Sequence, residues 1–166
     1  MDNPVLVGLT LCTALASGLV GGVFFAFSNF VMKALARLPP PQGIAAMQSI
    51  NVVVITPSFM TALFGTGLAS IVLSIAVAPS FGSAGSVLVM VGSVLYVVGT
   101  DFVTIGLNVP LNNVLAAVAP ESAEGARVWQ EYLQRWTAWN HVRTAASLAA
   151  SAAFVVALCF ARGPAG

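Results

Sequence analysis

The strongest constraint on this sequence is the length of its uncharged stretches. No charged residue occurs from Val5 to Met32, and none occurs from Gln42 to Thr100. Because about 20 consecutive apolar residues span a bilayer, the first stretch can form one transmembrane helix and the second can form more than one. Only 7% of the residues are charged and 58% are hydrophobic, whereas an average soluble domain has about 25% charged residues. These features predict an integral membrane protein.

Turn signals divide the apolar sequence into four spans. The prolines Pro39–Pro41 end the first span, and the segment 79–85, which is rich in Gly, Ser and Pro, separates the second from the third. The polar segment 111–137 precedes the fourth. We predict an all-α, single-domain protein (residues 1–166) that forms a four-helix membrane bundle with up-down topology. The expected spans cover 5–32, 50–77, 86–108 and 138–161, and a short amphipathic cytoplasmic helix precedes the last one.

Prolines and charge pairs add detail to this prediction. We expect Pro57 to kink the second span and Pro110 to bend or end the third. Charges at helical spacing in the polar segment predict a solvated helix that leads into the fourth span, with the ion pairs Glu124–Arg127, Arg127–Glu131 and Glu131–Arg135. Aromatic residues along this helix are expected at the membrane–water interface: Trp129, Tyr132, Trp136 and Trp139.

The Lys and Arg residues predict an orientation. Arg162 lies beside one end of the spans, and five other cations lie at the opposite end: Lys33, Arg37, Arg127, Arg135 and Arg143. The positive-inside rule therefore places both long connections in the cytoplasm and both termini outside, and we expect a bacterial cytoplasmic membrane. The net charge of +1 and the lack of a basic cluster exclude nucleic acid as a partner. Cys12 and Cys159 are expected to be buried thiols, with a disulfide possible if the first and last helices are neighbours.

Up-down topology would bring polar side chains from all four helices to the cytoplasmic end of the bundle. The members of this polar set are Asn29, Gln48, Asn51, Asp101, Asn108, Asn140, His141 and Arg143. Each amide could be an interhelical hydrogen-bonding group that fixes packing, or part of a pocket lining. We expect Asp101 and Arg143 to form an ion pair, since each is otherwise a lone charge at a similar depth.

The only histidine, His141, could transfer protons near neutral pH or lie exposed to water. One His, one buried Asp and two distant thiols fall short of the three or four ligands of a usual metal site, so no metal is predicted unless subunits share one. The sequence has no nucleophile triad, phosphate-binding loop or dinucleotide fingerprint. Proline-kinked helices could belong to a transporter, but no internal repeat relates the two halves.

Four motifs carry a resemblance to a known family. These are Gly22–Met32 (GVFFAFSNFVM), Met47–Asn51 (MQSIN), Asn108–Asn112 (NVPLN) and Trp136–Thr144 (WTAWNHVRT). Together they resemble the anthrone oxygenase-like family of small four-helix membrane proteins, over nearly the whole chain. The resemblance implies an oxygenase, because fungal members are associated with oxidising anthrones, which are tricyclic aromatic ketones, to anthraquinones with molecular oxygen and no established cofactor.

The resemblance suggests roles for the polar set. His141 would be the base that removes the substrate proton, Arg143 with Asn140 would hold the oxyanion, and Asp101 would orient one of them. Aromatic rings would stack on the small hydrophobic substrate, and amides would bind it, through Trp136, Phe25, Phe30, Asn29, Gln48, Asn51 and Asn108. The alternatives are a non-catalytic membrane subunit or small-molecule carrier, and a metal-dependent membrane oxidase. Strips of Ala and Gly in the spans would also permit a homo-oligomer within the bilayer.

Overall fold

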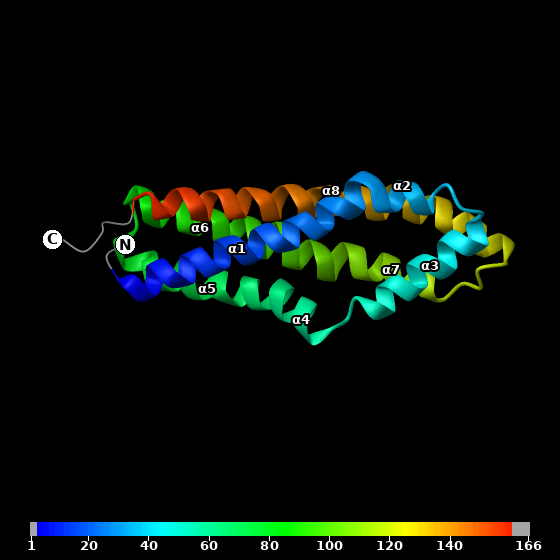
Figure 1. Ribbon diagram of the computed structural model, residues 1–166, viewed down its shortest axis with the longest axis horizontal. Helices are drawn as coiled ribbons and strands as arrows, with labels where there is room; N and C mark the ends of the chain where they lie inside the picture. Colours follow the sequence, from blue (N-terminus) through cyan, green and yellow to red (C-terminus); the bar gives the residue numbers. More distant parts are fainter. Residues whose placement is uncertain (1–2, 161–166) are drawn as a thin grey trace.

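The computed structural model describes residues 3–160, and this part of the chain is helical without strands (Figure 1). Four helices are long and apolar enough to cross a membrane: Pro4–Leu35, Pro57–Ser80, Ala84–Ala116 and Ala123–Leu158. They run up and down, so the first begins at the end of the bundle where the last one ends (Figure 1). The predicted all-α membrane bundle is therefore confirmed, and the chain is an integral membrane protein.

Three of the long helices contain π-helical turns. The elements in chain order are α1 (Pro4–Ala26), η1 (Phe27–Val31), α2 (Met32–Leu35), α3 (Pro40–Val53), α4 (Pro57–Met60), η2 (Thr61–Gly65), α5 (Thr66–Val77), η3 (Ala78–Ser80), α6 (Ala84–Tyr96), η4 (Val97–Phe102), η5 (Thr104–Asn108), α7 (Val109–Ala116) and α8 (Ala123–Leu158). Of these, η1, η2, η4 and η5 are π-helical and η3 is a 3₁₀ turn. Single π-helical turns often mark functional sites.

The second span begins later than predicted, because residues 50–53 belong to the separate helix α3. The helical pattern breaks at Val54–Thr56. Pro57 then occupies the first position of α4, and the Thr56 hydroxyl accepts a hydrogen bond from the Phe59 amide (3.2 Å) as an N-cap. Proline favours this first position because its missing amide hydrogen would have no helical partner there. Pro57 therefore starts a helix, and the prediction that it kinks one is wrong.

Pro110 has a smaller effect than predicted. It lies in the first turn of α7, and the helical path continues to Ala116. The π-helical turn η5 comes directly before it. Since a proline ring clashes with the carbonyl four residues earlier, a widened turn at this point lets the helix pass through the proline without ending.

Helix α8 joins the predicted solvated helix and the fourth span in one continuous element. The Ser122 hydroxyl accepts a hydrogen bond from the Gly125 amide (2.8 Å) and caps its start. Its 36 residues extend for about 54 Å, against a hydrocarbon core of about 30 Å. The helix is therefore longer than the hydrocarbon core, and we expect its charged first turns to project beyond it. The ion pairs Arg127–Glu124 and Arg135–Glu131 form there, whereas the predicted pair of Arg127 with Glu131 is not among the salt bridges of the described residues.

The aromatic residues of α8 are less exposed than the interface prediction required. Trp129, Tyr132 and Trp136 are buried, and their rings stack in sequence with centroids 5.7 and 5.8 Å apart. Residues of α2, α3 and α7 cover them in a second core cluster. Helix α3 approaches α8 closely at Gly43, where a Cβ atom would lie 2.9 Å from the Trp129 ring. These rings therefore fix the packing at this end of the bundle.

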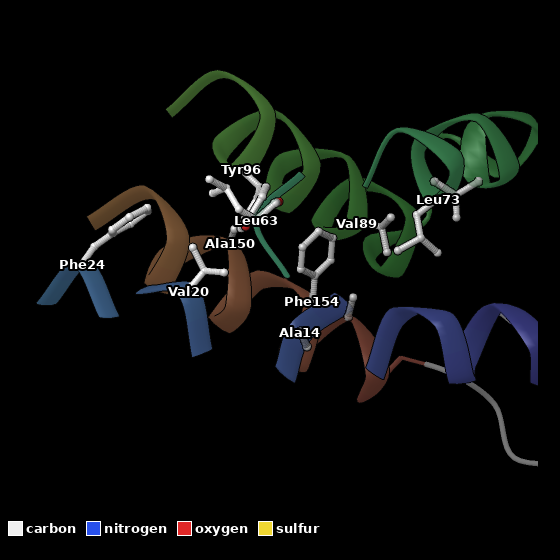
Figure 2. Close-up of a cluster of buried hydrophobic side chains, with 11 residues drawn as sticks. Ala14, Val20, Phe24, Leu63, Leu73, Val89, Tyr96, Ala150 and Phe154 are labelled. Atoms are coloured by element: carbon white, nitrogen blue, oxygen red, sulfur yellow. Dashed lines mark hydrogen bonds between the residues drawn. The ribbon is translucent and has the colours of Figure 1, made fainter. Parts of the chain in front are cut away.

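The main core lies between the four spans. Figure 2 shows its side chains converging from α1, η2, α5, α6 and α8, with Phe24 at one end of the row. Helices α1 and α8 pack closely because small residues face each other, for example Gly18 and Ser151, where a Cβ atom on Gly18 would lie 3.2 Å from the Ser151 hydroxyl. Cys12 and Cys159 lie outside this core, exposed and unpaired, so the prediction of buried thiols is wrong.

Candidate functional site

An aromatic pocket lies where the two core clusters meet. Its volume is about 180 Å³, and most of its lining is apolar. It is lined by Val23, Phe24, Phe27, Met47, Ile50, Asn51, Val54, Ile55, Phe59, Met60, Leu63, Phe64, Thr104, Val109, Asn112, Trp136 and Arg143. The π-helical turns η1, η2 and η5 each contribute at least one of these residues. A concave, largely apolar site with a few polar groups is the usual form of a small-molecule pocket.

Arg143 is the one charged residue among the described residues that line the pocket. Its side chain is buried, with only 5% of the residue exposed. The guanidinium Nη2 donates to Asn140 Oδ1 at 2.7 Å, and Nη1 donates to the Thr104 hydroxyl at 3.3 Å. Its Nε has no hydrogen-bond partner among the described residues. The positive charge thus meets neutral acceptors, and part of its donor capacity is unused.

Two aromatic faces cover the guanidinium. Its central carbon lies 4.1 Å from the centroid of the Phe24 ring and 5.1 Å from that of the Trp136 ring. Cation–π contacts of this kind contribute about 2 kcal/mol or more when the cation is desolvated. They offset part of the cost of burial without supplying a negative charge. Arg143 therefore remains able to bind an anionic group that enters the pocket.

A hydrogen-bond network between α1 and α8 holds Arg143 in place. Asn140 Nδ2 donates to the Phe24 carbonyl and to the Ser28 hydroxyl, both at 2.8 Å. Ser28 in turn bonds the Thr144 hydroxyl at 3.2 Å. Since Phe24 precedes η1 and Ser28 lies within it, the widened turn presents both acceptors to Asn140. The amide oxygen of Asn140 is then aimed at the guanidinium.

Several other predicted site residues serve packing. Gln48 Nε2 donates to the carbonyls of Leu115 and Val118 at 2.8 and 3.0 Å, and so caps the end of α7. Asn108 Nδ2 donates to the Trp136 carbonyl at 3.1 Å. These two amides tie α3 to α7 and η5 to α8. Of the predicted substrate-binding residues, Asn51 and Trp136 line the pocket.

The structure does not bring His141 to Arg143. Two residues along an α-helix turn the side chain by about 200°, so His141 points out of the opposite side of α8. It is exposed and lines a separate groove with Lys33 and Asn29. The expectation that these side chains share one polar site is wrong.

Phe25 and Phe30 also lie away from the pocket. Both are on the outer surface of the bundle, with 50% and 61% of each residue exposed. The inward positions of the same helix are Phe24, Phe27 and Ser28. We predicted that Phe25 and Phe30 stack on the substrate, whereas the pocket is lined by Phe24 and Phe27 of the same helix.

The predicted ion pair between Asp101 and Arg143 is also wrong. No salt bridge joins them within the described range, and Asp101 Oδ1 has no hydrogen-bond partner there. The Asp101 carboxylate packs against α5 at Gly67, where a Cβ atom would overlap it. Thr104, one turn further along, contacts Arg143 instead, because it faces α8 while Asp101 faces α5.

Sequence reasoning missed Phe24, Phe27, Thr104 and Asn112 as site residues. Thr104 and Asn112 share a helical face with Asp101 in the sequence, and this spacing could have identified them. Phe24 and Phe27 could be selected only once the position of α8 against α1 was known. No group of three or more His, Cys, Asp or Glu side chains gathers within the described residues 3–160.

The fold and the site define a class: a small four-helix membrane protein with a buried cation in an aromatic pocket. A family model described as anthrone oxygenase matches residues 57–153, more than half of the chain. The chain therefore belongs to the anthrone oxygenase family, and this membership supports an oxygenase-like function. Neither a curated protein nor a solved structure matches it.

Proposed function

We propose that this protein binds an anthrone-like aromatic ketone as its enolate and oxidises it to the quinone with molecular oxygen. The observation that carries the proposal is Arg143, a buried cation that lines an aromatic pocket and forms no salt bridge with a carboxylate of the described residues. A preorganised cation in a largely apolar site stabilises developing negative charge strongly. Family membership supports the oxidative chemistry.

The reaction balances without a further oxidant. An anthrone loses a proton from its methylene carbon, which gives an enolate whose negative oxygen would lie against Arg143. The electron-rich carbon adds dioxygen, and after proton uptake a carbon-bound hydroperoxide forms. Loss of water from this hydroperoxide breaks the O–O bond and leaves the second carbonyl. The sum is anthrone plus dioxygen to anthraquinone plus water, and the substrate carbon supplies the electrons that reduce oxygen.

The first proton would leave to water. The described residues that line the pocket include no His, Asp, Glu or Lys, so none of them supplies a side-chain base. In a hydroxylated anthrone the enolate is aromatic, and a nearby guanidinium favours it further. Arg143 would then act by stabilising the anion, and the role expected for His141 is not part of this proposal.

The rings of the substrate would lie between Phe24, Phe27 and Trp136. A pocket of about 180 Å³ slightly exceeds the roughly 150 Å³ cavity that holds benzene. A three-ring ketone would therefore extend through the open side, which is formed by Val54, Ile55 and Phe59. Ile55 is 68% exposed and lies beside the break between α3 and α4. This apolar rim suits a substrate that arrives from the bilayer.

The proposal includes no organic cofactor and no metal, with molecular oxygen as the co-substrate. It also places both termini outside a cytoplasmic membrane, on the strength of the five cations at one end of the spans. Small residues on the outer surface, such as Gly8 and Gly106, would allow a homo-oligomer.

Oxygen uptake by purified protein in lipid nanodiscs, with a hydroxylated anthrone as substrate, tests the proposal. We expect quinone absorbance to rise with one dioxygen consumed per substrate, at a rate above that of empty nanodiscs and of the Arg143→Met variant. The rate should persist after dialysis against a chelator. Binding without oxygen uptake would favour a carrier, and activity lost with chelator and restored by one metal would favour a metal-dependent oxidase.

A further inference from the structure

A polar groove on the side of α8 away from the aromatic pocket has no part in the proposed function. It lies between the α1–α2 segment and α8, at the end of the spans marked by Lys33. Its lining residues are Ser28, Asn29, Met32, Lys33, Ala36, Leu133, Thr137 and His141. It includes a lysine and the chain's single histidine, and no Asp or Glu is among its described lining residues. This composition favours an anionic group.

The groove offers hydrogen-bond donors that the fold does not use. The Thr137 hydroxyl is buried and has no partner among the described residues. Asn29 Nδ2 donates one hydrogen to the Phe25 carbonyl at 2.9 Å, which leaves its second N–H free for another acceptor. Lys33 and His141 are both exposed. A phosphate accepts several such bonds at once, since its oxygens are strong acceptors.

An apolar strip continues from the groove toward the middle of the membrane. On α1 it passes Phe25, which is half exposed, and Gly22, which has open space beside its Cα. On α8 it passes the exposed residues Ala145 and Leu148, one and two turns beyond His141. The two helices are antiparallel, so both parts of the strip lead away from Lys33 in the same direction. Free phosphate would leave this strip uncovered, whereas an acyl chain would cover it.

We propose that this groove binds an anionic phospholipid, with the phosphate at Lys33, Thr137 and His141 and one acyl chain along Phe25, Gly22 and Leu148. Basic pockets between helices at a membrane surface bind anionic headgroups in this way. The bound lipid would link α1 to α8 close to Ser28, the residue that also accepts a hydrogen bond from Asn140. Its effect would therefore be on the stability of the α1–α8 pair.

Native mass spectrometry of the delipidated, full-length protein tests the site. The first-lipid affinity is measured for phosphatidylglycerol and for phosphatidylcholine with the same acyl chains. We expect phosphatidylglycerol to bind roughly fivefold more tightly or better, since one lysine near a membrane surface contributes about that factor. Lys33→Gln should remove this preference. Arg37→Gln is the matched control, because Arg37 follows Lys33 by one turn but does not line the groove.

Thr137→Val removes only the unpartnered hydroxyl and keeps the shape of the side chain. We expect it to weaken phosphatidylglycerol binding two- to fivefold, as the loss of one hydrogen bond predicts, without lowering the thermal midpoint. Three results of these binding measurements would overturn the proposal, and a fourth would come from the oligomeric state. These are equal affinity for both lipids, equal effects of Lys33→Gln and Arg37→Gln, and displacement of the lipid by millimolar inorganic phosphate. A dimer that closes the groove without lipid would also contradict it.

Discussion

Helix α8 carries two polar side chains, Arg143 and His141, that are close in sequence but lie in different environments. Arg143 is buried in the aromatic pocket, where an amide, a hydroxyl and two rings surround it. His141 is exposed in the groove beside Lys33. The comparison teaches that the rotation of α8 and the packing around it decide which of the two side chains lines the aromatic pocket, whatever their reactivity in water.

The substitution with the largest expected effect removes the charge from the aromatic pocket and leaves the groove at His141 unchanged. Arg143→Met keeps a long, apolar side chain in the pocket but removes the charge. We expect turnover of an anthrone to fall by roughly 10² to 10³, the loss seen when one oxyanion-binding donor is removed. The thermal midpoint should stay within a few degrees of the parent, because a buried charge without a counter-charge adds little stability.

Arg135→Met is the matched control for this variant, since it makes the same substitution on the same helix outside the pocket. Its turnover should stay close to that of the parent. Equal losses in the two variants, or a fully active Arg143→Met protein, would show that Arg143 does not bind the substrate anion.

A second substitution keeps Arg143 but places a negative charge beside its guanidinium. Asn140→Asp places a carboxylate oxygen where the amide oxygen now accepts from the guanidinium at 2.7 Å. We expect this internal anion to compete with the substrate and to lower turnover by roughly 10- to 100-fold, as the strength of a hydrogen bond to a charged group predicts. Steady-state oxygen uptake in nanodiscs measures the effect.

Binding of a hydroxyanthraquinone, whose phenolate resembles the enolate, should weaken in parallel in the Asn140→Asp variant. Asn108→Asp is the matched control, because Asn108 is also a buried amide that donates to a backbone carbonyl but does not contact Arg143. If both variants bind the phenolate equally well after correction for folded protein, the charge of Arg143 is not what the pocket uses.

His141→Gln should have a much smaller effect on turnover. Because His141 lies in the groove, we expect a loss below about tenfold, whereas removal of a general base usually costs 10² to 10⁴. The same oxygen-uptake measurement distinguishes this small loss of turnover from the large loss expected for a general base. A loss of 10² or more would restore the assignment of His141 as the base and would require the imidazole to reach the pocket.

Cysteine labelling should reveal a difference in solvent access between the rim of the aromatic pocket and the groove. In a variant that lacks Cys12 and Cys159, Ile55→Cys at the rim of the pocket should react with a lipid-soluble maleimide. Ala36→Cys at the groove should react with a charged one, and only from the cytoplasmic side. Reaction of Ile55→Cys with the charged reagent would contradict an opening toward lipid, and labelling of Ala36→Cys from outside would contradict the proposed orientation.

The sequence by itself determined the helical membrane fold. Stretches without charge from Val5 to Met32 and from Gln42 to Thr100 allow little else in a bilayer, because backbone groups there must bond within helices. It also indicated Trp136, Asn140 and Arg143 as a group, since one helix face at 3.6-residue spacing carries all three. These conclusions rest on local periodicity and composition, which a single sequence contains.

Only the tertiary structure decided which polar groups meet. The break at Val54–Thr56 assigns Asn51 to a separate helix that covers the pocket, a result of Pro57 and its N-cap that hydropathy does not show. The rotation of each helix about its axis selects Phe24 over Phe25 and Thr104 over Asp101 as neighbours of Arg143. A difference of one residue turns a side chain by about 100°, and π-helical turns shift this phase further. Packing against α8 therefore determined the site, because it fixed a rotation that the periodicity of each helix leaves free.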